Sequence, residues 1–227
     1  MQSIRRYALY LAPTGPWAEA AADWLGWDLA TGRARAQPDL PALPRPLSAL
    51  TAEARKYGFH ATIKPPFRLA EGQDVQALTA AVAMLCARLA PVETDGLAPS
   101  DLDGFLALTP LGETAALDAL AADVVRSLDA FRAPSSDAEL ARRRAAGLNP
   151  AQEENLARWG YPYVMGEFRC HLTLTGRLAP DEAATVQAAA RRHLGPMPAP
   201  WRIDSLVLAG EQADGGFRLL HRYAFTG

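Results

Sequence analysis

The chain has 227 residues, with 23 basic and 25 acidic side chains and a formal net charge of −2 at pH 7. Its composition, 49% hydrophobic and 21% charged, is typical of a globular protein and excludes a disordered or fibrous chain. The near-zero net charge argues against a broad nucleic-acid-binding surface and against a polybasic membrane binder, while a local basic cleft stays compatible with it.

Two cysteines, Cys86 and Cys170, are too few for a disulfide framework or a cysteine-based zinc site. The longest uncharged apolar stretch, 75–87, is shorter than the ~20 residues that a membrane span needs. The apolar run at 7–13 is too short for the core of a signal peptide. We therefore expect a soluble cytoplasmic protein that does not act at a membrane.

The first part of the chain predicts strands that alternate with helices. Pro16 suits the first turn of a helix, and Asp74 is a good N-cap for another. The prolines between 32 and 48 predict an irregular connection. The predicted order is strand 7–11, helix 16–29, strand 57–69, helix 75–89, strands 92–97 and 105–108, and helix 115–132.

The second part of the chain begins with a segment, 135–163, that predicts two short helices. Ser136 with Glu139 has the spacing of a capping box, and Gly147 and Gly160 are suitable C-terminal glycines. The elements predicted after it are strand 164–178, helix 180–194, and strands 202–208 and 217–225.

A strand, a helix and a hairpin thus occur twice in the same order, at 57–108 and at 164–225. This repeat predicts an α+β fold with two pseudo-symmetric lobes of antiparallel β-sheet and helices on their outer faces. We expect a single bilobal domain over 1–227. Residues 135–163 are then a helical insertion and a candidate lid.

The two long predicted strands carry the same short motif. His60-Ala61-Thr62 lies in the first and His171-Leu172-Thr173 in the second. Because residues i and i+2 of a strand share a face, each histidine points the same way as its threonine. If the two strands meet, two imidazoles and two hydroxyl groups line one central cleft.

This set of groups suits the cleavage of a phosphodiester. The reaction needs a base that activates water and an acid that protonates the leaving oxygen, and two imidazoles can hold opposite protonation states near neutral pH. Hydroxyl groups two residues away can donate to the non-bridging phosphate oxygens. We therefore predict His60 and His171 as catalytic and Thr62 and Thr173 as phosphate-binding residues.

The two motifs resemble the signature of the 2H phosphoesterase superfamily, which has the LigT-like RNA ligase and cyclic phosphodiesterase fold. Residues 55–67, 158–164 and 168–176 are similar to one bacterial branch, whose members are labelled phosphonate-metabolism proteins. The resemblance covers nearly the whole chain. It implies metal-independent hydrolysis of a 2′,3′-cyclic nucleotide or a sugar cyclic phosphate, without a cofactor.

Four further residues are predicted to contact the substrate. Lys64 and Arg169 share a strand face with the histidines by parity, and Tyr161 and Tyr163 can stack on a base or sugar. The consecutive Arg142, Arg143 and Arg144 predict a solvated helix face, or a clamp for a second phosphate if the insertion closes as a lid. The expected partner is a small phosphorylated substrate or an RNA end, with no obligate protein partner.

Two alternatives stay open on the residues alone. The same cleft can hold a nucleotide or an RNA end without turning it over. A metal site on the two histidines is the other alternative, with Glu167 as the only nearby carboxylate on the face of His171. His193 is predicted to be structural because it ends a helix, and His221 is left unassigned.

Overall fold

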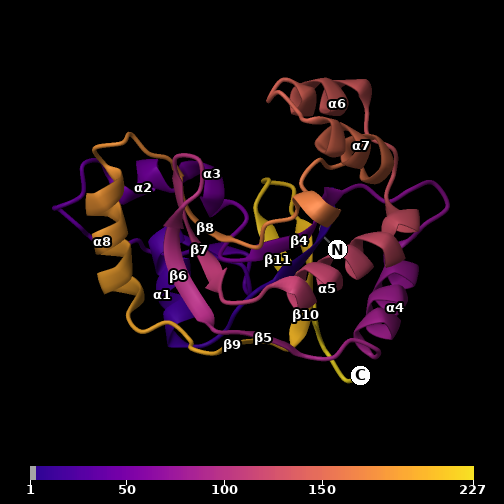
Figure 1. The fold of residues 1–227 in the computed structure, drawn as a ribbon, viewed down its shortest axis with the longest axis horizontal. Coiled ribbons are helices and arrows are strands. Elements are labelled where there is room, and N and C mark those ends of the chain that lie inside the picture. The colour runs from indigo at the N-terminus through magenta and orange to yellow at the C-terminus, as the bar shows by residue number, and fades with distance from the viewer. Residues whose placement is uncertain (1–3) are drawn as a thin grey trace.

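The computed structural model describes residues 4–227, and its central feature is one antiparallel sheet of seven strands (Figure 1). The strand order is β11-β10-β1-β4-β8-β7-β6, and every neighbouring pair is antiparallel. Helices pack on this sheet, so the predicted α+β class with antiparallel strands is confirmed. The strands are β1 (Tyr7–Leu11), β4 (Ala61–Phe67), β6 (Gly96–Asp101), β7 (Phe105–Leu111), β8 (Leu172–Arg177), β10 (Ser205–Glu211) and β11 (Phe217–Ala224).

The middle of the sheet is a narrow junction between two halves. Strands β4 and β8 are paired only at Ala61 and Leu172, and the two strands diverge from that pair. Strands β1, β10 and β11 lie on the side of β4, whereas β7 and β6 lie on the side of β8. The expected lobes are therefore halves of one continuous sheet, and not separate sheets.

Each half contains a hairpin from the other repeat. The β6–β7 hairpin follows β4 in the chain but pairs with β8, and the β10–β11 hairpin follows β8 but pairs with β1, beside β4. Helix α4 (Val75–Cys86), at 12 residues about 18 Å long, packs on β10 and β11. Helix α8 (Ala183–Leu194) packs on β6 and β7. The two sequence repeats thus exchange their hairpins, so each half of the sheet combines the long strand of one repeat with the hairpin of the other.

The remaining helices follow local signals in the sequence. Helix α1 begins with Pro16 and ends at Gly26, whose φ of 77° lies in the left-handed region that favours glycine. Its Trp24 is fully buried and donates to the carbonyl of Leu174 at 3.0 Å, which ties α1 to β8. The bounds are α1 (Pro16–Leu25), α2 (Leu47–Leu50), α3 (Ala52–Arg55), α5 (Ala115–Ser127), α6 (Asp137–Arg144) and α7 (Pro150–Trp159), with short 3₁₀ turns η1 (Asp129–Phe131) and η2 (Met165–Glu167).

Several predicted elements are longer than the observed ones. The strands expected at 57–69 and 164–178 shorten to β4 and β8, because Gly58 forms a turn with a φ of 70° before β4 and η2 interrupts the backbone before β8. The segment expected to be irregular, 32–48, contains β3 (Arg33–Ala34), which pairs with β2 (Trp27–Asp28). A separate pair, β5 (Val92–Thr94) with β9 (Trp201–Ile203), lies outside the main sheet.

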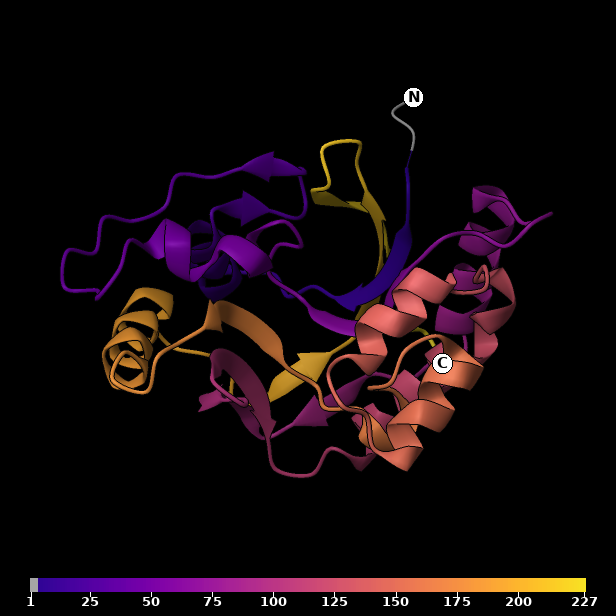
Figure 2. The ribbon, with the colours of Figure 1, turned by 90° about the horizontal axis from the view of Figure 1, so that it is seen from above.

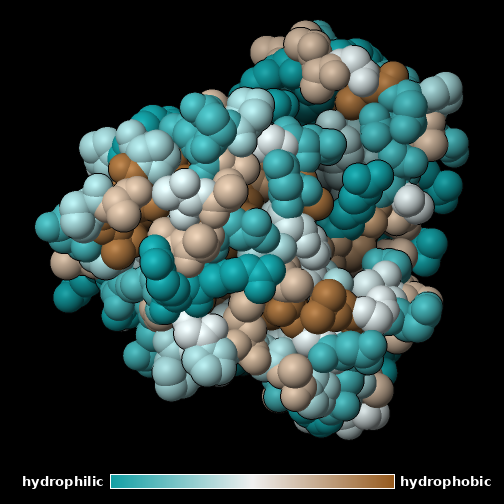
Figure 3. Space-filling view, turned by 60° about the vertical axis from the view of Figure 1, so that its left-hand side comes forward, coloured by the Kyte–Doolittle hydropathy of each residue, from teal (hydrophilic) through white to brown (hydrophobic). Residues whose placement is uncertain are grey.

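The insertion forms the two predicted helices, and both begin with a complete capping box, Ser136 with Glu139 and Asn149 with Gln152. It lies on the same side of the molecule as α4 and α5 and projects from the body (Figures 1 and 2). Helix α6 buries none of its side chains, and α7 buries only Leu156. In the space-filling view this projection stands at the top, where hydrophilic and hydrophobic residues are mixed (Figure 3).

Polar contacts attach the insertion to the body, among them those of Arg68 and Arg132. Arg68, which follows β4, donates twice to Glu139, with both N–O distances at 3.0 Å. Arg132 donates to the carbonyl of Arg158 at 3.2 Å. Few buried apolar contacts support α6, so we expect it to open at low free-energy cost. Within residues 4–227, no helix is both long enough and apolar enough to span a membrane.

Replacing Glu139 with alanine is expected to release α6, because one carboxylate supplies both the capping box and the bond to Arg68. A lost cap costs about 1 kcal/mol and a lost exposed ion pair up to ~1 kcal/mol, so amide exchange in α6 should accelerate roughly tenfold. Hydrogen exchange followed by mass spectrometry measures this. Glu153→Ala is the matched control, because Glu153 pairs with Arg144 inside the insertion. Equal exchange in both variants would contradict the anchoring role of Glu139.

Candidate functional site

The two His-x-Thr segments meet at the single pair that joins β4 to β8. Ala61 and Leu172 are fully buried, so their side chains point into the core. Alternation along the strands places the histidine and threonine on either side of each on the opposite face. His60 and His171 each directly precede the paired residue of their strand, and the charge of His171 lies near enough to lower the pKa of His60. The fold therefore brings two imidazoles and two hydroxyl groups together at the junction of the sheet halves.

The hydrogen bonds of His60 fix its tautomer. Its Nδ1 lies 3.0 Å from the carbonyl oxygen of Gly58, which can only accept, so Nδ1 carries the proton. Its Nε2 lies 3.0 Å from Oγ1 of Thr62, and in the neutral ring this hydroxyl donates to Nε2. Burial, with a smaller contribution from the charge of His171, lowers the pKa of His60 to about 4, although the hydrogen bond to Gly58 acts in the opposite direction. His60 is therefore neutral at pH 7, with a basic Nε2.

His171 has the same arrangement as His60. Its Nδ1 donates to the carbonyl oxygen of Arg169, two residues earlier, at 2.8 Å. Within residues 4–227, Nε2 is the ring nitrogen of His171 without a hydrogen-bond partner. In both motifs the backbone two residues before the histidine thus holds the ring through Nδ1, which leaves Nε2 as the nitrogen that can exchange a proton; in His60 that nitrogen is already in contact with Thr62.

Aromatic rings surround the two imidazoles. The Tyr10 ring of β1 lies 3.8 Å from the ring of His60 between centroids, at an interplanar angle of 32°. Tyr57 lies 6.2 Å from His60, and Phe105 lies 5.8 Å from His171. Tyr10 lies opposite Thr62 in the strand pairing and is fully buried, and burial raises its pKa. Sequence reasoning missed Tyr57 and Phe105, which come from a turn and from the exchanged hairpin.

An open cavity of about 360 Å³ lies beside this cluster. His60, Thr173, Tyr57 and Phe105 contribute to its wall, which is large enough for a small ligand. Thr175 also lines it, but its Oγ1 accepts a bond from the Phe105–Leu106 segment, at 2.9 Å from the Leu106 nitrogen. That contact gives Thr175 a structural role in joining β8 to β7.

Lys64 does not lie with the histidines, although its parity predicted that it would. A bulge in the β1–β4 pairing sets Tyr10 opposite Thr62 but Leu9 opposite Lys64, and opposed residues share a face. Lys64 therefore points to the side of the buried Leu9, and its own side chain is only 2% exposed. There it donates to the carbonyl of Val125 and to Asp129.

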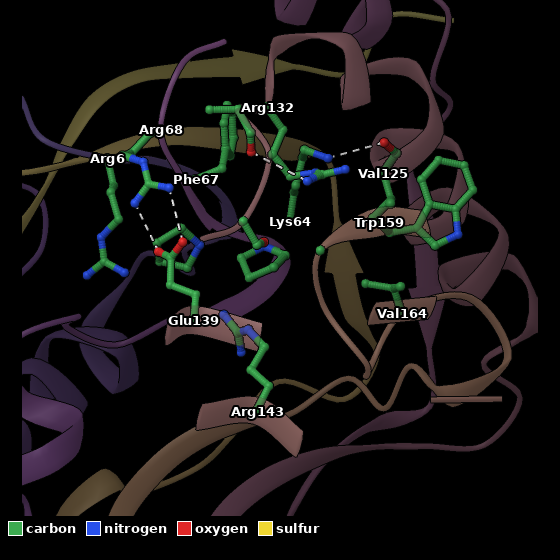
Figure 4. Close-up of a pocket in the computed structure, with 15 residues that line it drawn as sticks. Arg6, Lys64, Phe67, Arg68, Val125, Arg132, Glu139, Arg143, Trp159 and Val164 are labelled. Carbon is green, nitrogen blue, oxygen red and sulfur yellow. Dashed lines mark hydrogen bonds and ion pairs between the residues drawn. The ribbon is translucent and has the colours of Figure 1, made fainter. Parts of the chain in front are cut away.

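Lys64 lines a second, smaller cavity, which we call the arginine cavity (Figure 4). Its cationic lining residues are Arg6, Lys64, Arg68, Arg132 and Arg143.

The other predicted contact residues lie near the edge of the site. The side chain of Arg169 is exposed, and the residue contributes its carbonyl to His171. Tyr161 is half-buried beneath Arg143, and Tyr163 is 43% exposed and packs edge-on against Tyr161 at 5.6 Å. Neither tyrosine lines the cavity of His60.

The histidines and carboxylates do not gather into a metal site in the described part of the chain, where no three His, Cys, Asp or Glu side chains form a group. Glu167, the carboxylate of the metal alternative, accepts bonds from Asn149 and Gln152 at the start of α7. His193 bonds the carbonyl of Ala20 at 2.9 Å, which supports its structural assignment. Burial raises the pKa of the Cys170 thiol to about 12, so it stays protonated.

The fold and the cleft define an α+β protein with a polar, aromatic-lined site at the junction of two sheet halves. The chain belongs to the family described as "Protein of unknown function (DUF1045)", whose model matches residues 62–218.

Similar proteins include a curated one from Janthinobacterium sp. (strain Marseille), named ribose 1,5-bisphosphate phosphokinase PhnN, which is 41% identical over 100% of this chain and 52% of its own length. The chain spans about half the length of the curated relatives it matches. Similar solved structures include one titled as a phosphoesterase, with a TM-score of 0.47 and 15% identity, covering 99% of this chain and 100% of that chain. Another is E. coli LigT in its apo form, with a TM-score of 0.45 and 13% identity over 99% of each chain.

Proposed function

We propose that this protein is a cyclic phosphodiesterase that hydrolyses a 2′,3′-cyclic nucleotide or a sugar cyclic phosphate by acid–base catalysis with two histidines. One observation carries the proposal: two imidazoles with the same tautomer, each beside a threonine, flank a single strand pair on one face of the sheet. That is the set of groups which a phosphodiester needs for proton transfer at both ends of the reaction.

In this mechanism His60 is the base and His171 the acid. His60 is neutral at pH 7, so its Nε2 takes a proton from the water that attacks phosphorus. The bond from phosphorus to one ring oxygen breaks, and protonated His171 gives its Nε2 proton to that leaving oxygen. The product is a phosphate monoester with a free hydroxyl group.

The threonines stabilise the negative charge on the phosphate oxygens. Thr173 donates from the side of His171, and Thr62 donates from the side of His60. When Nε2 of His60 gains its proton, it becomes a donor to Oγ1 of Thr62, and the Thr62 hydroxyl is freed to donate to the substrate. Base and oxyanion donor are thus coupled through a 3.0 Å contact.

The relatives' names favour a phosphorylated ribose as the ligand class. The curated relative is named for a phosphokinase of ribose 1,5-bisphosphate, and we take from it only that kind of ligand. The sequence contains both His-x-Thr motifs and has no Gly-x-x-x-x-Gly-Lys-Ser/Thr loop, which many kinases use. With the resemblance to the phosphonate-metabolism branch, this supports a phosphodiesterase that acts on a ribose cyclic phosphate.

The direct test is turnover of a panel of 2′,3′-cyclic nucleotides and ribose cyclic phosphates by the purified protein, with and without chelator. We expect a phosphate monoester product and equal rates in both conditions. Tight phosphate-dependent binding without product would instead favour the binding module, for a nucleotide or an RNA end. Loss of the activity in chelator would contradict the two-histidine mechanism.

The pH profile tests the role of His60. Its pKa is lowered to about 4, so the ring is neutral and basic above pH 4 and loses its lone pair to a proton below it. On the acid side of the profile, we expect kcat/KM to stay constant from pH 7 down to pH 5 as far as His60 is concerned. Below pH 4 it should fall about tenfold per pH unit. Far-UV circular dichroism at each pH confirms the fold. An acid limb centred near the ordinary histidine pKa, about 6.5, would show that His60 is not the desolvated base.

A further inference from the structure

The two histidines of the cleft have the same local geometry, yet the proposed reaction needs one of them as a base and the other as an acid. In each motif Nδ1 donates to the carbonyl oxygen two residues earlier, at 3.0 Å for His60 and at 2.8 Å for His171. The local backbone therefore does not explain why the two imidazoles should differ. The difference has to come from the side chains that pack against each ring.

The ring of Tyr10 packs against the ring of His60. The two centroids are 3.8 Å apart and the ring planes meet at 32°, which is close to a stacked arrangement. Within residues 4–227, the aromatic contact of His171 is with Phe105, which lies 5.8 Å away at 62° and meets it by an edge. Tyr10 thus gives His60 a stacked cover that its counterpart does not have in the described part of the chain.

Tyr10 lies behind His60 as seen from the cavity. His60 lines the cavity of about 360 Å³, whereas Tyr10 is fully buried and takes no part in its wall. Tyr10 belongs to a small apolar cluster on this face of the sheet, where Val207 is its cross-strand neighbour and Phe217 lies 6.0 Å away between ring centroids. Water can therefore reach the imidazole from the cavity but not through Tyr10.

The ring of Tyr10, and not its hydroxyl group, is the part that acts on His60. The Tyr10 hydroxyl is buried and has no hydrogen-bond partner within residues 4–227. The two ring nitrogens of His60 are in contact with Gly58 and Thr62 instead. A buried hydroxyl without a partner costs stability, so phenylalanine should serve as well as tyrosine at this position.

A cover of this kind affects the two protonation states of an imidazole differently. Exclusion of water destabilises the charged form and lowers the pKa, whereas the face of an aromatic ring attracts a cation and opposes this effect. The pKa of His60 is lowered to about 4, with burial as the main cause, so the exclusion of water is the larger effect. The other titratable or charged side chains near this imidazole are Tyr57 and His171 and, in the wall of the cavity, Glu53 and Arg177.

We propose that Tyr10 is a positioning residue that makes His60 the base of the pair, because its ring covers one face of the imidazole, excludes water from it and holds it in place beside the cavity. His171, which has no stacked ring within residues 4–227, is left to carry the proton that the leaving oxygen receives. The assignment of base and acid rests on the proposed function, whereas the effect of Tyr10 on His60 is measurable without turnover.

The test follows the titration of His60 by NMR in variants of two tyrosines of β1, with His60→Gln to assign the signals. Tyr10→Ser, which removes the ring and leaves a polar space that water can enter, should move the pKa of His60 from about 4 toward the ordinary 6.5. Tyr10→Phe, which keeps the ring and removes the unpartnered hydroxyl, should leave it unchanged. Tyr7→Ser is the matched control, because Tyr7 is buried in the core on the opposite face of the same strand.

The pH dependence of turnover gives a second readout of the same effect. We expect kcat/KM at pH 5 relative to pH 7 to be roughly three- to tenfold lower in Tyr10→Ser than in the wild type, and equal to the wild type in Tyr10→Phe and Tyr7→Ser. Tyr10→Leu is a milder replacement in case Tyr10→Ser does not fold, and it should move both readouts in the same direction by less. Far-UV circular dichroism checks the fold of each variant.

The outcomes separate the role of Tyr10 from the proposed function. An unchanged or lower pKa of His60 in a folded Tyr10→Ser or Tyr10→Leu, or an equal rise in Tyr10→Phe, would overturn the role of the ring and leave the phosphodiesterase activity standing. A rise confined to the variants without the ring, in a protein that turns over no cyclic phosphate, would support the role of Tyr10 and overturn the activity. The wild-type spectrum tests the stack itself: a ring at 3.8 Å should shift the ring protons of His60 upfield, and unshifted protons would overturn the proposal.

Discussion

Alanine at His60 or at His171 is expected to abolish most of the phosphodiesterase activity. Each imidazole transfers one proton in the proposed reaction, and loss of a general acid or base typically costs 10²- to 10⁴-fold in rate. We expect kcat to fall by about that factor in either variant, with a much smaller change in KM, because the threonines and the aromatic wall still bind the substrate. Steady-state kinetics on the best cyclic phosphate of the panel measures both constants.

The double variant and one control sharpen this result. Because acid and base act in one reaction, His60→Ala combined with His171→Ala should cost little more than either single change. His221→Ala is the control: this exposed histidine lies on β11 against Tyr223, away from the junction, and should keep full activity. Undiminished turnover in either catalytic variant would overturn the mechanism.

Removing Asp129 is expected to be the most destabilising of the single charge deletions considered. Lys64 is 2% exposed and has Asp129 as its only carboxylate partner within residues 4–227, at 3.2 Å. A buried charge left without its partner costs about 3 kcal/mol or more, so Asp129→Ala should lower the free energy of unfolding by about that much. Lys64→Met removes the charge and retains the volume, and should change stability by about 1 kcal/mol or less, in either direction.

Urea denaturation at pH 7 gives these free energies, with Asp123→Ala as the control. Asp123 lies on α5, the helix that precedes η1 and its Asp129, and pairs with Arg88 in an exposed ion pair at 3.4 Å, which contributes at most ~1 kcal/mol. Similar losses in Asp129→Ala and Asp123→Ala would show that Lys64 does not depend on Asp129.

The pH dependence of stability offers a second measure of Lys64. Burial lowers its pKa to about 8, below the ordinary 10.5, so between these values the unfolded chain binds more protons than the folded one. Stability from this group therefore rises as pH increases from about 8 to 10.5, because the cost of a buried charge disappears. Lys64→Met should remove this rise.

The central chemistry was readable in the sequence because it depends on strand parity. The positions of His60, Thr62, His171 and Thr173 follow from alternation in two strands and from the assumption that those strands meet. The capping box of Ser136 with Glu139 was predicted equally well, because its spacing is local, whereas the second box, Asn149 with Gln152, was not predicted. The catalytic roles of the two histidines and the phosphate-binding roles of the two threonines stay predictions.

Where long-range pairing decides the geometry, the same reasoning failed. Lys64 has the right parity, but a bulge against Leu9 and Tyr10 turns it to the other face. The bulge arises from the pairing of β4 with β1, so the sequence of β4 alone does not predict it. Phe105 reaches His171 because its hairpin crosses to the other half of the sheet. The exchange of hairpins is invisible in a pattern that lists elements only in chain order.

That exchange also governs when the site can form during synthesis. Strand β1, next to the His60 strand, has its other edge open until β10 pairs with it, and β10 is some 200 residues later in the chain. Contacts of such long range form slowly, and the free edge of β1 favours aggregation until β10 pairs with it. The ribosome must therefore release residues 205–224 before the sheet beside His60 is complete, and chaperone demand should be greatest in that interval.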